Sequence, residues 1–154
     1  MNDATSTTEV PPATHEDFVD RFAAGWRDPS PEAFMPILHE EIRMIQPLMP
    51  DQVGYDGLRR FLRGTFALFP GLRGEVVRWG AHGDDLFIEL RMRGTLGGRP
   101  IAWTVVDRFR LRDGKATERE TIFDPAPLAL AVLTRPRAWP AFWRTQVLAR
   151  RGGL

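Results

Sequence analysis

Hydrophobic residues in the first part of the chain recur at helical spacing. Phe18, Phe22 and Trp26 repeat every four residues, and Thr14 with Asp17 three positions later forms a helix-start signal. We therefore expect an amphipathic helix over 15–27. A second set at the same spacing predicts another long helix over 56–69, and its members are Leu58, Phe61, Leu62, Phe66 and Phe69.

Shorter elements lie between these two helices. Residues 31–38 begin with Pro31 after a Ser and are typical of a short helix. Ile42, Met44 and Gln46 then alternate with Arg43 and Ile45, which predicts a brief strand ending before Pro47.

After residue 71 the period of the pattern changes from 3.6 to 2, which indicates strands. Three turn signals separate the expected strands 72–81, 85–95, 100–111 and 115–124, namely His82-Gly83-Asp84, Gly97-Gly98-Arg99 and Arg112-Asp113-Gly114. Loops this short join antiparallel neighbours, because parallel strands need long crossovers. Helices followed by a long meander predict an α+β fold with its helices on one face of the sheet.

Composition sets the domain plan and excludes several function classes. The 154 residues are enough for one domain, and 43% hydrophobic with 27% charged residues is typical of a globular protein. We expect a disordered tail over 1–13, a domain over 14–125 and a C-terminal helical segment over 126–154 that packs on it. Trp139, Phe142 and Trp143 in that segment are expected to be covered, with the segment acting as a lid.

Charge and cysteine content narrow the partners. Basic and acidic residues number 21 and 20, so the formal charge of +1 argues against nucleic acid or an anionic membrane as partner. The chain has no cysteine, which excludes disulfides and thiolate chemistry. No apolar stretch approaches a membrane span, and we expect a cytoplasmic protein.

Asp107 is the most informative polar residue. It shares a strand face with Trp103, Val105 and Phe109, so a carboxyl group stands in an apolar stripe. Burial disfavours the charged form of a carboxyl group, which would suit it to donating or moving a proton. The alternative is a structural aspartate bonded to a neighbouring hydroxyl or Arg.

The turn at 112–114 decides what faces Asp107. A two-residue turn at Asp113-Gly114 places Asp107 opposite Glu120, giving a pair of carboxyl groups. A three-residue turn places Asp107 opposite Arg119, with Thr121 and Phe123 beside it. Residue pattern alone leaves both registers open.

Other candidates are fewer. Gln46 ends the short strand and is a candidate for the lining of a pocket. His15, His39 and His82 lack the spacing of metal ligands, so we expect no metal site. The many Phe and Trp residues exceed what a shallow core needs, and some are expected to line an apolar pocket.

The segments Val106 to Lys115 and Thr121 to Pro125 resemble the last hairpin of the SnoaL-like polyketide cyclases and ketosteroid isomerases, within the nuclear transport factor 2-like superfamily. The upstream helices and the strand ending at Pro47 match the same pattern, so the resemblance covers about 14–125. It implies a conical barrel of helices on a curved antiparallel sheet. Such barrels carry several different activities.

Carried onto this chain, the resemblance places Asp107 at the oxyanion-hole aspartate of the isomerases, whose protonated state is a known case of a carboxyl group kept neutral. It also places Thr121 and Phe123 on the cavity face, which favours the three-residue turn. Gln46 stands where the isomerases have their general base, and Phe22 replaces their tyrosine. Epoxide hydrolases of the superfamily carry Arg-x-Asp where this chain has Glu89-Leu90-Arg91.

Two functions follow as hypotheses. The first is a cofactor-free isomerase or cyclase in which Asp107 is catalytic and moves a proton of an apolar polycyclic or ketone substrate. The second is a non-catalytic ligand-binding or dimerisation module. The expected substrate-binding residues are Phe22, Trp26, Gln46, Trp103, Phe109, Thr121 and Phe123. We also expect a homodimer through the outer face of the meander, with Val77, Trp79, Phe87, Thr104 and Val106 in it.

Overall fold

A computed structural model describes residues 14–151. The helical elements are α1 (His15–Arg27), α2 (Pro31–Phe34), the 3-10 turn η1 (Met35–Ile37), α3 (Gly54–Leu68), α4 (Ala126–Leu133), the 3-10 turn η2 (Pro136–Ala138) and α5 (Trp139–Arg150). The strands are β1 (Leu38–Ile45), β2 (Gln52–Val53), β3 (Arg73–His82), β4 (Asp85–Leu96), β5 (Arg99–Arg112) and β6 (Lys115–Ile122). The predicted α+β class is confirmed.

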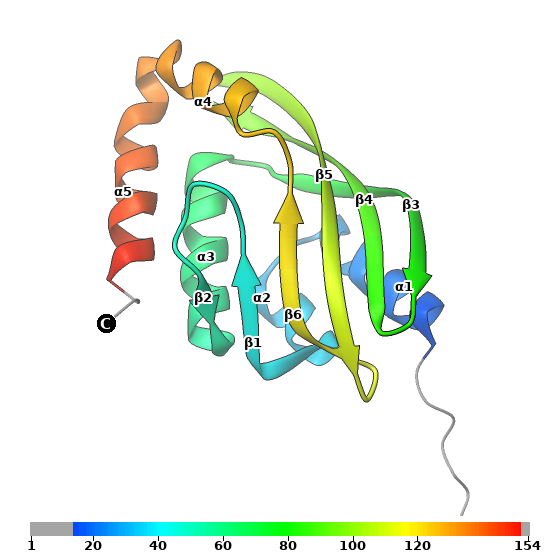
Figure 1. Cartoon of the computed structure of the whole chain (residues 1–154). Helices are drawn as coiled ribbons and strands as arrows, with labels where there is room; N and C mark the ends of the chain where they lie inside the picture. The colour runs from blue at the N-terminus through cyan, green and yellow to red at the C-terminus, as the bar shows by residue number, and fades with distance from the viewer. Residues whose placement is uncertain (1–13, 152–154) are drawn as a thin grey trace, which may run out of the picture.

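The strands form one curved, open sheet in the order β2-β1-β6-β5-β4-β3. β1 runs parallel to β6, and the other neighbouring pairs are antiparallel. Helices α1, α2 and α3 all lie on one side of this sheet (Figure 1). The hydrophobic core fills the space between them. β2, a strand of two residues beside β1, is an element that the sequence pattern did not predict.

Helix α1 begins and ends where its sequence signals place it. Thr14 accepts a hydrogen bond from the Asp17 amide, and the Asp17 side chain accepts one from the Thr14 amide, which completes a capping box. Phe18, Phe22 and Trp26 are each at most 2% exposed and face the sheet. The four-residue spacing therefore marks the buried face of this helix.

The hairpin between β5 and β6 has neither of the two predicted registers. Asp113 and Gly114 have φ of 53° and 76°, so they form a two-residue turn of the type that requires left-handed backbone at both positions, and Arg112 pairs with Lys115. A β-bulge at Thr117 then shifts the ladder by one residue. Asp107 consequently pairs with Thr121, while Glu120 pairs with Arg108 on the outer face.

A second bulge changes which side of the sheet Trp79 occupies. The ladder between β3 and β4 is irregular at Val77, so Trp79 pairs with Ile88, which is completely buried. Side chains of paired residues share a face. Trp79 therefore belongs to the helix side, near the edge of the sheet, and the prediction that placed it on the outer face was wrong.

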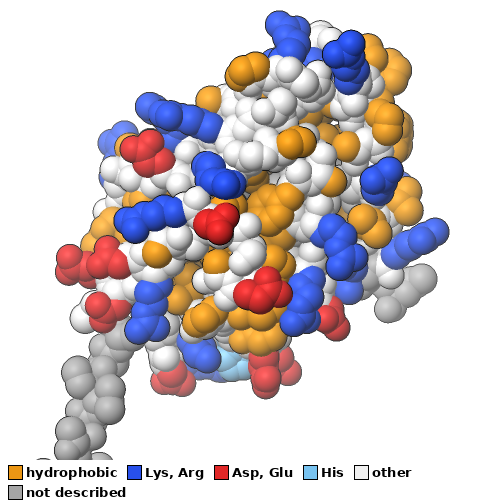
Figure 2. Space-filling view, turned by 180° about the vertical axis from the view of Figure 1, so that it is seen from behind, with side chains coloured by type: hydrophobic (Ala, Val, Ile, Leu, Met, Phe, Trp, Pro, Cys, Tyr) orange, Lys and Arg blue, Asp and Glu red, His pale blue; other side chains and the backbone are white. Residues whose placement is uncertain are grey.

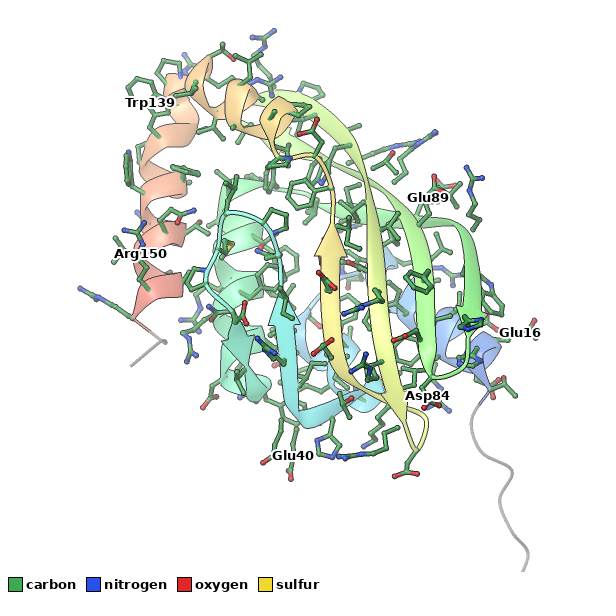
Figure 3. The ribbon with its side chains drawn as sticks, in the orientation of Figure 1. Glu16, Glu40, Asp84, Glu89, Trp139 and Arg150 are labelled. Carbon is green, nitrogen blue, oxygen red and sulfur yellow. The ribbon has the colours of Figure 1, made fainter. Side chains whose placement is uncertain are left out.

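The C-terminal helices pack beside α3. Gly64 allows this approach, because a Cβ atom at that position would lie 2.8 Å from Cγ2 of Thr145. The Thr145 hydroxyl donates a hydrogen bond of 3.0 Å to the Gly64 carbonyl. Trp139 and Trp143 nevertheless remain 45% and 62% exposed, so the expectation that both are covered was wrong. Trp139 lies at the start of α5 (Figure 3). None of the described helices is long and apolar enough to cross a membrane.

Candidate ligand-binding cavity

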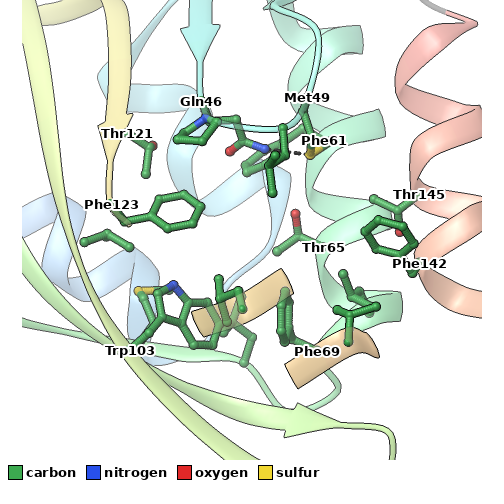
Figure 4. A pocket seen from close by; sticks show the side chains of 18 of the residues that line it. Gln46, Met49, Phe61, Thr65, Phe69, Trp103, Thr121, Phe123, Phe142 and Thr145 are labelled. Carbon is green, nitrogen blue, oxygen red and sulfur yellow. Dashed lines mark hydrogen bonds between the residues drawn. The ribbon is translucent and has the colours of Figure 1, made fainter. Parts of the chain in front are cut away.

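A cavity of about 320 Å³ lies between the concave face of the sheet and helices α3, α4 and α5. Its wall is formed mainly by carbon (Figure 4). The aromatic side chains that line it come from six positions, Trp26, Phe61, Phe69, Trp103, Phe123 and Phe142. Such a wall fits a flat, ring-containing molecule.

The segment between β1 and β2 closes one side of the cavity, with Pro47, Leu48 and Met49 in the wall. Gln146 of α5 donates to the Leu48 carbonyl at 3.4 Å, which ties this segment to the C-terminal helix. At its far end Arg43 donates to Asp51 at 2.7 Å. That hydrogen bond raises the pKa of the exposed Arg43 guanidinium.

The polar side chains that line the cavity come from β6, α3, α5 and the segment after β1, and those of β6 include the charged Arg119. Arg119 and Thr121 both line it, and each contacts the carboxyl group of Asp107 from β5. Arg119 Nη2 donates to Asp107 Oδ2 at 2.7 Å, and Thr121 Oγ1 donates to Asp107 Oδ1 at 2.7 Å. Asp107 is completely buried and lies behind these two side chains, outside the lining itself.

Both contacts stabilise Asp107 as a carboxylate, because each oxygen accepts a hydrogen bond and one donor is a cation. The guanidinium is held from its other sides by aromatic rings, with its Cζ 5.8 Å from the Phe22 centroid and 5.9 Å from the Phe109 centroid. This geometry differs from the expected neutral, proton-donating aspartate. Asp107 instead orients Arg119 and Thr121 toward the cavity.

Two buried donors at the cavity have no acceptor within residues 14–151. They are Nε of Arg119 and Nε1 of Trp26. Both side chains belong to the lining, and both pack against the Phe22 ring. Buried N–H groups without a partner are rare and costly in folded proteins. A ligand oxygen accepting from either group would remove that cost.

The structure brings together five of the eight predicted site residues in the lining, Trp26, Gln46, Trp103, Thr121 and Phe123. Phe22 and Phe109 are 1% and 0% exposed and lie in the core, where they hold Arg119. Neither residue lines the cavity, and Trp26 lies one helical turn closer to it than Phe22.

Sequence reasoning missed Thr65, Phe142 and Thr145 as lining residues. A signal for Thr65 was present, because it lies four residues after Phe61 and four before Phe69 on an apolar helix stripe. The other two depend on how α5 packs against α3, which no local pattern reports.

Acidic and imidazole groups are missing from the wall. Within residues 14–151 no Asp, Glu or His lines the cavity, and no cluster of three such residues is placed to hold a metal ion. The chemistry available at the wall is therefore that of hydroxyl, amide, indole and guanidinium groups, with one carboxylate directly behind them.

The helices, the open curved sheet and the mainly apolar cavity between them define a small α+β domain with an internal cavity. A family model for the SnoaL-like domain matches residues 19–119. The chain therefore belongs to the SnoaL-like family. Among curated proteins, none matches the sequence.

Solved structures share the fold at low identity. TerC co-crystallised with polyporic acid is 24% identical, with a TM-score of 0.70 over 77% of this chain and 97% of that one. A protein of ketosteroid isomerase-like fold from Catenulispora acidiphila, in complex with trimethylamine, is 18% identical, with a TM-score of 0.67 over 79% and 93%. A SnoaL-like polyketide cyclase from Jannaschia sp. is 20% identical, with a TM-score of 0.65 over 82% and 94%.

Proposed function

We propose that the protein binds a flat, largely apolar ketone or polycyclic molecule in the cavity and acts on it as a cofactor-free isomerase or cyclase. The observation that carries this proposal is the cluster of Arg119, Thr121 and Asp107 at a cavity that is lined mainly by apolar side chains. Membership of the SnoaL-like family and the co-crystallisation of TerC with polyporic acid support a ligand of this kind.

The proposed reaction is proton transfer at a carbon next to a carbonyl group. The C–H bond breaks and its proton passes to Thr121 Oγ1, while the Thr121 proton passes along the 2.7 Å hydrogen bond to Asp107 Oδ1. The electron pair of the C–H bond forms the carbon–carbon double bond of an enolate, and the π pair of the carbonyl group moves to its oxygen, which faces the guanidinium of Arg119. Return of the proton to another carbon completes an isomerisation.

A second candidate is a non-catalytic binding module of the same fold. One observation favours it: Asp107 has both oxygens occupied and lies outside the cavity lining. In that case the carboxylate only holds Arg119 and Thr121 in place, and the cavity binds the same class of ligand without changing it.

Hydrogen–deuterium exchange separates the two candidates. With β-tetralone as the probe in deuterium oxide, we expect the protein to accelerate exchange of the protons next to the carbonyl, followed by NMR. Thr121→Val removes the hydroxyl relay and keeps the shape of the side chain. We expect it to lower the protein-dependent rate by about 10²–10⁴-fold, the usual contribution of a positioned acid or base.

The same variant must still bind. Trp26 and Trp103 line the cavity, so tryptophan fluorescence reports on the ligand. If the protein binds β-tetralone but the exchange rate equals that in buffer without protein, the enzymatic proposal is overturned and the binding module remains. An exchange rate in Thr121→Val equal to that of the parent protein would show that Thr121 takes no part in the proton transfer.

We also propose a homodimer through the outer face of β4, β5 and β6. Phe87 and Ile122 are 39% and 48% exposed there, beside an ion pair of 2.8 Å between Arg108 and Glu120. This mixture of apolar and paired charged groups is typical of a non-obligate interface. Light scattering at micromolar concentration is expected to give a dimer, and Ile122→Arg a monomer. A monomeric parent protein would refute this interface.

A further inference from the structure

Helix α5 has two different faces. Its inner face, with Phe142, Thr145 and Ala149, packs toward α3 and the cavity. Its outer face carries Trp139, Trp143 and Val147 at intervals of four residues, with exposed fractions of 45%, 62% and 48%. A helix that is covered on one side only, and keeps two tryptophans on the other, presents an unpartnered apolar stripe.

The stripe continues onto α4. Leu130 and Leu133 are 62% and 68% exposed, and Leu133 also lines the cavity. We call Leu130, Leu133, Trp139, Trp143 and Val147 the α4–α5 face. Figure 2 shows hydrophobic side chains together with Lys or Arg along the corresponding edge of the molecule.

The charge of this region is one-sided. Residues 125–154 contain no Asp or Glu and five arginines, Arg135, Arg137, Arg144, Arg150 and Arg151. All 20 acidic residues therefore lie in the rest of the chain, which has more acidic than basic residues. The net charge of +1 conceals this separation. Arg144 and Arg150 are exposed beside the apolar stripe, and Arg150 projects from the end of α5 (Figure 3).

We propose that the α4–α5 face binds the surface of an anionic membrane. Tryptophan and leucine side chains on one helix face insert at the boundary of headgroups and acyl chains, and flanking arginines pair with anionic headgroups. Each arginine near such a surface adds to the attraction. In this mode of binding the helices lie in the plane of the membrane, so no membrane-spanning helix is required.

Charge argues against a second copy of the chain on this face. A two-fold interface on this face would bring the exposed arginines of α5 against their twins, and like charges at close range oppose association. Membrane binding would place Leu133, at the cavity wall, next to lipid. An apolar ligand dissolved in the bilayer would then reach the cavity without crossing water.

Co-sedimentation with vesicles tests the proposal. The probes are vesicles of phosphatidylcholine with phosphatidylglycerol and vesicles of phosphatidylcholine alone. We expect the full chain to bind the anionic vesicles at least about tenfold more tightly, and added salt to weaken that binding. Trp143→Ala and Arg144→Glu are each expected to reduce binding several-fold, because both side chains are exposed on the proposed surface.

Matched controls lie elsewhere on the protein. Trp79→Ala removes a 43% exposed tryptophan from β3, and Arg21→Glu reverses an exposed charge on α1. Both are expected to bind as the parent does. Equal affinity for neutral and anionic vesicles, no binding, or equal losses in the controls would overturn the proposal. Vesicle binding and β-tetralone binding are separate measurements, so one proposal can fail without the other.

An interaction with another protein, or with a second copy, has its own signature. A change in the solution mass of Trp143→Ala by light scattering, with no affinity for either vesicle, would assign the α4–α5 face to protein contact. That result would also overturn the membrane proposal.

Discussion

Replacing Asp107 with asparagine is expected to destabilise the protein by about 3–5 kcal/mol, the usual cost of removing one partner from a buried ion pair. Asp107 is completely buried and Arg119 is 9% exposed, so the guanidinium would lose its counter-charge without gaining water. The measurement is urea-induced unfolding of parent and variant at neutral pH. This result would identify Asp107 as a structural anion, whatever further role it has.

Two controls make the experiment specific. Glu120→Gln changes a carboxyl group on the outer face, paired with Arg108, and should change the free energy of unfolding by less than about 1 kcal/mol. Asp107→Asn combined with Arg119→Met removes both charges, so the double variant is expected to recover much of the lost stability. An Asp107→Asn protein as stable as the parent would refute the buried ion pair.

Truncation after Pro136 is expected to lower the melting temperature strongly and abolish binding of apolar ligands. The deletion removes α5, which contributes Phe142 and Thr145 to the cavity wall and buries Ala149. Fully burying an apolar side chain contributes about 1.5–3 kcal/mol, so loss of the inner face of α5 costs several kcal/mol. Thermal unfolding and tryptophan fluorescence titration with β-naphthol measure the two effects.

Thr145→Val tests the hydroxyl group that joins this helix to α3. It deletes the hydrogen bonds to the Gly64 and Ala141 carbonyls with little change of shape, and we expect a loss of about 1 kcal/mol with binding retained. A truncated protein with the parent's melting temperature and affinity would show that α5 forms no part of the cavity.

Much of the fold was readable from the sequence because its signals are local. The predicted α1 over 15–27 coincides with His15–Arg27, and the four predicted strands of the meander match β3 to β6 within about two residues. Capping by Thr14, apolar spacing and Gly-containing turns each act within a few residues.

The register errors have a common physical cause. Bulges at Val77 and Thr117 each insert one residue into a ladder, and one residue reverses the face of every side chain that follows. Neither residue type marks a bulge. The cavity face of Thr121 was nevertheless predicted, through the family resemblance, although its turn was wrong.

The site was harder to predict than the fold, because the depth at which each side chain is buried depends on tertiary packing. Phe22 and Trp26 share one helix stripe, yet the first supports Arg119 from the core and the second lines the cavity. The hydrogen-bond partners of Asp107 are Arg119 and Thr121 from the neighbouring strand. The alternation of side chains along the strand identified Asp107 as a buried carboxyl group. Its ion pair with Arg119 could be found only from the observed strand register.

A crystal structure with β-naphthol bound tests the central claim most directly. We predict the ring system among Trp26, Trp103 and Phe123, with the hydroxyl oxygen within about 3.5 Å of a nitrogen of Arg119 or of Thr121 Oγ1. A ligand bound outside the cavity, or one inside it whose oxygen points away from β6 toward α5, would contradict the assignment of Arg119 and Thr121 as the polar end of the site.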